Sequence, residues 1–262
     1  MGWAETQENQ EKMPYDAEGA TTIPYMYLPM LLPLMFFWQA VVQIYWLVVV
    51  YKTSWNDYIR ELSPVITSFS VSILCNAAST ILDFYGFPLS AGVAKMLPPF
   101  FLCACLFLTL NIAENHMAEM STAHRWCYLL LVENCEGFSL TWSHAETTST
   151  VSTILVRHFN VGLDTVVSIH QTQLAVCVIF MYSVELIFHR IFRWVVASHI
   201  PILLWAFTLH NLAMIGDVTV WLLVVASGIF VANKIVALAC SKQDQGKSTE
   251  TIISPFWHVK II

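Results

Sequence analysis

The sequence predicts an all-α fold, a polytopic transmembrane helical bundle of six to seven spans. Apolar residues make up 57% of the 262 residues and charged residues only 11%, whereas about a quarter of a soluble domain is charged. The apolar residues gather in a series of runs, each close to the ~20 residues that a helix needs to cross a bilayer. A net charge of −6 provides no basic face, which excludes nucleic acid as a partner.

The chain divides into three parts by composition. Residues 1–22 form a polar, acidic N-terminal segment without the basic n-region of a cleaved signal peptide. Residues 23–240 form a single transmembrane domain, and residues 241–262 are expected to be a disordered tail. We therefore expect no separate soluble domain.

Seven apolar runs are the candidates for spans. They are expected at Tyr25–Tyr51, Pro64–Phe84, Ser90–Ala113, Trp126–Trp142, Gln171–Phe188, Trp194–Met214 and Val218–Cys240. The second run is rich in Ser and Thr, and it either spans the membrane or forms a re-entrant or interfacial helix. Pro98 and Pro99 should kink the third run.

Two polar stretches separate these runs. Lys52–Ser63 is expected to be a loop, and Ser143–Ser168 is expected to be a loop with a helix lying on the membrane surface. Arg190 and Arg193 indicate that the connection before Trp194 is cytosolic. The mixed charges of the first loop leave its side of the membrane open.

Ionisable residues inside spans are costly and are functional hypotheses by default. Glu133 and Glu136 lie three apart on one helical face. They could hold a metal or share a proton; the alternative is that one bonds to a neighbouring helix and the other lies near the interface. Glu185 and His189, four apart, suggest an ion pair at the membrane edge.

Lys234 lies within two turns of the membrane edge, where its side chain is expected to snorkel toward water. His199 and His210 are eleven residues apart, roughly 16 Å along a helix, and therefore cannot bind the same small ion. Their span has no partner histidines in the second, third or last span, which argues against haem. The sequence thus indicates no cofactor and no metal.

Short motifs follow one another in order along the chain. They are Ser63-Pro64-Val65-Ile66-Thr67-Ser68, Val132-Glu133-Asn134, Leu140-Thr141-Trp142, Ile169-His170, and His210-Asn211 with Asn233 23 positions later. In order and spacing they resemble the FRAG/DRAM/Sfk superfamily, and within it the second post-GPI-attachment factor and the related CWH-type N-terminal domain. The resemblance covers about residues 25 to 240. The Cys-Glu-x-Gly that the family has after His-Asn is absent here, as in a divergent member.

This resemblance implies a Golgi or ER membrane protein that acts on membrane lipids and GPI-anchored proteins. Its function would be GPI-anchor lipid remodelling, by catalysing or only assisting the reacylation of lyso-GPI. As a hypothesis, Glu133, His170 and His210 converge at the extracytoplasmic end of the bundle. A histidine there would act as general base toward a lysolipid hydroxyl, with a carboxylate orienting it.

The motif asparagines have a different expected role. Asn134, Asn211 and Asn233 would tie helices together by buried hydrogen bonds.

Two other functions fit the same pattern of spans. One is a non-enzymatic membrane modulator, as in the autophagy-linked DRAM branch of the superfamily. The other is a seven-span receptor with its acidic N-terminus outside. Against the receptor, Ser143–Ser168 contains no cysteine for a disulfide and the loops are short.

Overall fold

The computed structural model describes residues 28–52, 56–116, 120–187, 194–212 and 214–244. The predicted segment 1–22 lies outside these residues. Every regular element in the described ranges is a helix: α3 (Leu28–Lys52), α4 (Asn56–Phe84), α5 (Pro88–Met96), α6 (Pro98–His116), α7 (Thr122–Cys127), the π-helix η2 (Tyr128–Glu133), α8 (Asn134–Phe159), α9 (Leu163–Ile187), α10 (His199–Asn211) and α11 (Asp217–Asp244). The predicted all-α class is confirmed.

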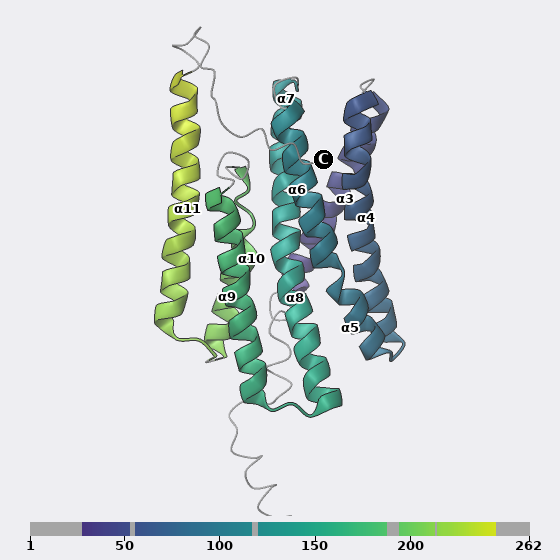
Figure 1. Cartoon of the computed structure of the whole chain (residues 1–262), viewed down its shortest axis with the longest axis vertical. Coiled ribbons are helices and arrows are strands. Elements are labelled where there is room, and N and C mark those ends of the chain that lie inside the picture. Colours follow the sequence, from purple (N-terminus) through teal and green to yellow (C-terminus); the bar gives the residue numbers. More distant parts are fainter. Residues whose placement is uncertain (1–27, 53–55, 117–119, 188–193, 213, 245–262) are drawn as a thin grey trace, which may run out of the picture.

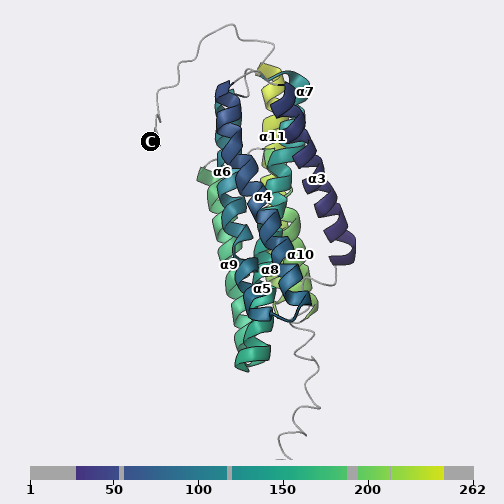
Figure 2. The ribbon, with the colours of Figure 1, turned by 90° about the vertical axis from the view of Figure 1, so that its right-hand side faces the viewer.

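The long helices lie side by side along one axis (Figure 1). A view turned by 90° shows the same arrangement, with α3 inclined along one side (Figure 2). α8 is the central helix, because it contacts α3, α5, α6, α9 and α10. It therefore joins an α4–α6 group on one side to α9–α11 on the other (Figure 1).

Five helical segments in the described residues are long and apolar enough to cross a membrane. They are Pro33–Lys52, Ile59–Phe84, Pro88–His116, Leu163–Ile187 and Asp217–Val236. Several such helices are the hallmark of a multi-pass membrane protein. The predicted number of six to seven spans is not confirmed, because α8 is rich in Ser and Thr and α10 has only 13 residues.

The second predicted span is part of a longer helix. α4 begins at Asn56 and continues through Pro64, so the predicted loop Lys52–Ser63 is wrong for most of its length. The predicted kink at the Pro98-Pro99 pair is confirmed: α5 ends at Met96 and α6 begins at Pro98. Proline is tolerated at a helix start, where its missing N–H would have no helical partner.

The predicted loop Ser143–Ser168 is also wrong, because α8 continues to Phe159. Its polar side chains are accommodated without leaving the helix: the hydroxyls of Thr148 and Thr150 donate to the carbonyls four residues earlier. The helix ends at Asn160, whose positive φ of 52° is the left-handed conformation common after a helix C-terminus. The resulting α8–α9 hairpin extends past the ends of α4 and α11 (Figure 1).

The first residues of the predicted tail 241–262 belong to a helix. α11 continues to Asp244, so residues 241–244 are helical. Residues 245–262 lie outside the described part of the chain.

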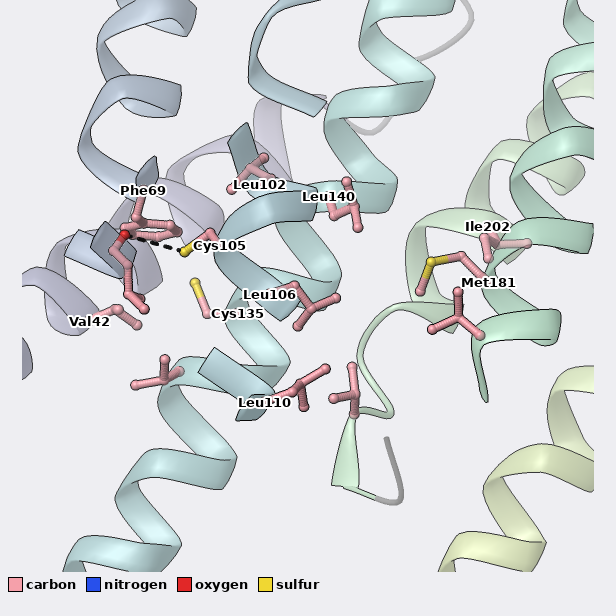
Figure 3. Packing of buried hydrophobic residues seen from close by; sticks show 14 of the residues in the cluster. Val42, Phe69, Leu102, Cys105, Leu106, Leu110, Cys135, Leu140, Met181 and Ile202 are labelled. Atoms are coloured by element: carbon pink, nitrogen blue, oxygen red, sulfur yellow. Dashed lines mark hydrogen bonds between the residues drawn. The ribbon is translucent and has the colours of Figure 1, made fainter. Parts of the chain in front are cut away.

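The largest apolar core lies where α4, α6 and α8 meet α3. Figure 3 shows Cys105 and Cys135 among Val42, Phe69 and Leu102, which are all at most 1% exposed. The outward faces of the bundle are apolar too, with exposed side chains such as Leu47, Leu74, Phe100, Ile179 and Trp221. Apolar groups on both the inside and the outside are what a lipid solvent requires.

Candidate functional site: buried polar groups around α8

The interior of the bundle contains many polar side chains, and α8 contributes more of them than any other described helix. Its buried polar residues are Asn134, Glu136, Ser139, Thr141, Ser143, Thr148, Ser149 and Ser152. The π-helix η2 leads directly into this segment, and π-helical turns occur frequently at functional sites. Because buried polar groups need partners, the bonds of these residues show which of them are structural.

Glu136 is completely buried and ties three helices together. Its Oε1 accepts a hydrogen bond from the Thr109 hydroxyl at 3.0 Å and from the Cys105 thiol at 3.2 Å, both on α6. Cys105 Sγ also lies 3.5 Å from the Val65 carbonyl oxygen on α4. The Cys105 thiol thus lies between Val65 of α4 and Glu136 of α8. Both residues belong to or lie near the short motifs described above.

Glu133 and Glu136, which the sequence places on one helical face, have different surroundings. Glu133 is 1% exposed and is the last residue of η2. No group of three or more His, Cys, Asp or Glu side chains that could hold a metal ion occurs among the described residues. Instead, Glu136 bonds to a neighbouring helix, which is the alternative stated from the sequence.

Asn134 clamps α8 to the chain segment before α10. Its side-chain oxygen accepts hydrogen bonds from the backbone N–H of Val196 and Ala197, at 2.8 and 3.0 Å. Its amide donates to the carbonyls of Leu129 and Trp194. Four bonds from one side chain fit the expected structural role.

The two other motif asparagines lie elsewhere. Asn211 and Asn233 are exposed. The buried interhelical bonds expected for these two residues are therefore not found.

His170 on α9 is fully buried against an aromatic ring. Its imidazole lies edge-on to Trp205 of α10 at a centroid distance of 6.2 Å, and His144 of α8 contacts the same indole at 6.0 Å. Within the part of the chain that the structure describes, neither ring nitrogen of His170 has a hydrogen-bond partner. His170 is thus a buried base without a structural bond.

His210 lies at the junction between α10 and α11. Its Nε2 is 3.4 Å from Asp217 Oδ1, and its Nδ1 is 3.4 Å from the Ile215 carbonyl oxygen. The Gln171 amide donates to the Met214 carbonyl in this same junction. His170, the neighbour of Gln171, therefore lies at the same end of the bundle as His210.

Glu133 does not join the two histidines. It precedes His144 by eleven residues, which is roughly 16 Å along a helix. His144 and His170 contact the same Trp205 ring, so they lie at the same height in the bundle. Glu133 is therefore far from His170 along the bundle axis, toward the end that contains α7. Of the three candidate catalytic residues, His170 and His210 thus lie at the same end of the bundle, and Glu133 does not.

A second polar cluster was not recognised from the sequence. Glu185, His199 and Lys234 meet between α9, α10 and α11, with a distance of 3.0 Å from Glu185 to His199 and 2.9 Å from Glu185 to Lys234. The prediction that Lys234 snorkels is wrong, because its side chain is 9% exposed and paired. The predicted partner of Glu185, His189, lies outside the described residues.

Comparison of the chain with protein-family models, with curated proteins and with solved structures found no match. The fold and the site define a class: a multi-pass helical membrane protein with ionisable and amide side chains buried between its helices.

Proposed function

We propose that this protein remodels the lipid of GPI anchors in ER or Golgi membranes, acting in or assisting the reacylation of lyso-GPI. The ordered motifs of the sequence are the basis for this choice of substrate. The observation that carries it into the structure is His170, a buried imidazole whose ring nitrogens have no hydrogen-bond partner among the described residues. No structural hydrogen bond would have to be broken for such a nitrogen to accept a proton from a substrate hydroxyl.

The distribution of basic residues supports an extracytoplasmic location for His170. Lys52 ends α3, Arg60 lies near the start of α4, and Arg125 lies in α7, all at one end of the bundle. α9 also ends at this end of the bundle, and the sequence that follows it contains Arg190 and Arg193. Because connections rich in Lys and Arg stay in the cytosol, we assign this end to the cytosolic side.

The opposite end then faces the lumen. It includes the junction of α10 and α11 with His210 and Asp217, and the level of His170. A GPI-anchored protein is extracytoplasmic, so its lipid would meet the bundle at this end. The proposed orientation thus places the candidate histidines on the side of the substrate.

The proposed chemistry is general base catalysis by His170. A neutral imidazole nitrogen accepts the proton of the lysolipid hydroxyl as the oxygen attacks the carbonyl carbon of an acyl donor. The proton then passes to the leaving group of that donor. Glu133 is too far along α8 to orient His170, so this proposal gives it no part in the reaction.

A non-enzymatic membrane modulator is the second candidate. The observation that favours it is the separation of Glu133 from the level of His170, which leaves His170 without the orienting carboxylate expected from the sequence. Such a protein would have the same fold without an effect on GPI acyl chains.

Mass spectrometry of GPI-anchor lipids distinguishes the two functions. Cells that lack the protein are compared with cells in which it is restored. Accumulation of lyso-GPI, or loss of the second acyl chain, that is reversed on restoration supports remodelling. An unchanged lipid profile contradicts it and favours the modulator. Fluorescence microscopy of a tagged protein tests the ER or Golgi location.

A further inference from the structure

The charged cluster between α9, α10 and α11 has no role in the proposed remodelling. We propose that Glu185, His199 and Lys234 form a proton-binding site, and that uptake of a proton by His199 weakens the docking of α11. The inference is independent of GPI-anchor chemistry. It rests on the geometry and charge balance of this cluster and on how α11 is attached.

One carboxylate serves two bases in this cluster. Glu185 Oε1 lies 3.0 Å from His199 Nε2, and Glu185 Oε2 lies 2.9 Å from Lys234 Nζ. The three side chains are 1%, 4% and 9% exposed, respectively. Charged groups so far from water need compensation, and the single carboxylate can balance only one positive charge.

Lys234 is the better candidate for that positive charge. Its ammonium group donates to the Val195 carbonyl as well as contacting Glu185. His199, whose Nε2 lies 3.0 Å from Glu185 Oε1, then stays neutral. Within the described residues, neither ring nitrogen of His199 makes a hydrogen bond, so an added proton would displace no hydrogen bond of the ring.

Among the described contacts of His199, the groups besides Glu185 are aromatic rings. Phe230 of α11 stacks on its ring at 6.0 Å, and Tyr182 of α9 lies 5.6 Å away. The Tyr182 hydroxyl is bonded to Ser227 at 2.7 Å. Besides Glu185, the acidic residues of α9 and α11 are Asp164 and Asp217 in the first turns, at the opposite end of the bundle, and Asp244, which ends α11 ten residues beyond Lys234.

α8 packs against the start of α10 through Gly137, which lies close to Val195 and Ser198. The acidic residues nearest to Gly137 in sequence are Glu133, which ends η2, and Glu136 of α8, and Glu136 is turned to α6. A proton added to His199 would therefore leave the cluster with an excess positive charge, which the aromatic rings only partly offset.

The attachment of α11 makes this charge consequential. Its buried side chains in the described range are Val220, Ser227 and Lys234, spaced by seven residues along one stripe. Two of the three are polar and bond to α9, through Tyr182 and Glu185. Because polar bonds help to hold helices together in lipid, an unbalanced charge at Lys234 should loosen α11.

Thermal unfolding of four proteins tests the proposal. Wild type, His199→Gln, Lys234→Met and the double variant are placed in lipid nanodiscs, and Tm is followed by tryptophan fluorescence from pH 8 to 5. The contribution of His199 to Tm is measured twice: as wild type minus His199→Gln, and as Lys234→Met minus the double variant. The other histidines are the same in both members of each pair, so their effects on Tm cancel.

With Lys234 present, we expect the contribution of His199 to Tm to fall as the pH is lowered from 8 to 5, because the added proton brings an unbalanced positive charge. With Lys234→Met, protonated His199 neutralises Glu185, so the contribution should rise instead. Each change should be about 2–4 °C. A contribution that is independent of pH, or that has the same sign in both backgrounds, overturns the proposal.

Two further measurements use only wild type and His199→Gln. They test the proposal even if the Lys234→Met variants do not fold. Selective ¹⁵N-histidine NMR of wild type and His199→Gln identifies the His199 signal, and a signal that does not titrate between pH 8 and 5 overturns the proposal. Backbone amide hydrogen exchange in α11 is compared between wild type and His199→Gln at pH 5.5 and at pH 8. Exchange should be faster in wild type at pH 5.5 and equal in the two proteins at pH 8. Equal exchange at pH 5.5 would contradict the link to α11.

Discussion

The side-chain oxygen of Asn134 lies 2.8 Å from the backbone nitrogen of Val196 and accepts its hydrogen bond. This bond crosses from α8 to the residues that precede α10. Backbone groups outside a helix must find partners when they are buried in a membrane bundle. Asn134 supplies those partners, and the close approach of α8 to α10 depends on it.

Substitution of Asn134 by Ala should destabilise the protein by about 2–4 kcal/mol, because several buried backbone groups lose their partners at once. Asn233→Ala is the matched control, since Asn233 is exposed on α11. Thermal unfolding in detergent measures both. A Tm of Asn134→Ala equal to that of Asn233→Ala would show that the clamp is not needed.

Gly137→Ala should be destabilising because the new methyl group has no room. A Cβ at this position would lie 2.5 Å from Val195 Cγ1, and overpacking of this kind costs about 1–3 kcal/mol. Combination with Val195→Ala should restore part of the loss. Gly228→Ala, which meets nothing within 4 Å, is the control, and an equal effect at both glycines would contradict the close packing.

The Glu185–Lys234 pair should show strong coupling. At pH 8, Glu185→Gln or Lys234→Met alone leaves a buried charge without its partner, which costs about 3–5 kcal/mol. The double variant should lose less than the sum of the two single variants. Equilibrium unfolding of the four proteins measures the coupling, and additive losses would mean that the two charges do not interact.

The proposed orientation predicts which cysteines can be labelled in sealed microsomes. In a background with exposed Cys127 replaced by Ser, Tyr51→Cys at the end of α3 should react with a membrane-impermeant maleimide. Phe159→Cys at the end of α8 should react only after the membrane is permeabilised. Tyr51 and Phe159 are both exposed, so the opposite pattern would reverse the assignment of the two sides.

The helical membrane class could be predicted because it depends on local composition. The apolar residues of α3, α4, α6, α9 and α11 occur in runs of membrane length, and no interhelical contact is needed to recognise them. The Pro98-Pro99 pair likewise predicts the break between α5 and α6, because the effect of proline on a helix is local.

The course of α8 could not be predicted from the same signals. Ser143 to Ser152 is rich in hydroxyl groups and reads as a loop, because hydropathy assumes that a helix in the bundle faces lipid. Instead, α8 packs against several other helices. The Thr148 hydroxyl donates a hydrogen bond to the backbone carbonyl of His144 in the same helix. Contact with other helices in place of lipid is information that the hydropathy of α8 alone does not contain.

The candidate site was only partly predictable for a related reason. Spacing within a helix places Glu133 and Glu136 on one face, but it does not say which helix that face meets. Lys234 and Glu185 lie 49 positions apart in sequence, so their pairing depends on the packing of α11. The available signal was their opposite charge inside two spans, since intramembrane charges pair with one another.

The most direct test of the role of His170 is the rescue of cells that lack the protein. Wild type, His170→Gln and the matched control His158→Gln, a histidine exposed on α8, are expressed at equal levels with equal Tm, and GPI-anchor lipids are measured by mass spectrometry. We predict that wild type and His158→Gln restore the two-chain lipid, whereas lyso-GPI persists with His170→Gln. Full restoration by His170→Gln would contradict a catalytic role for this residue.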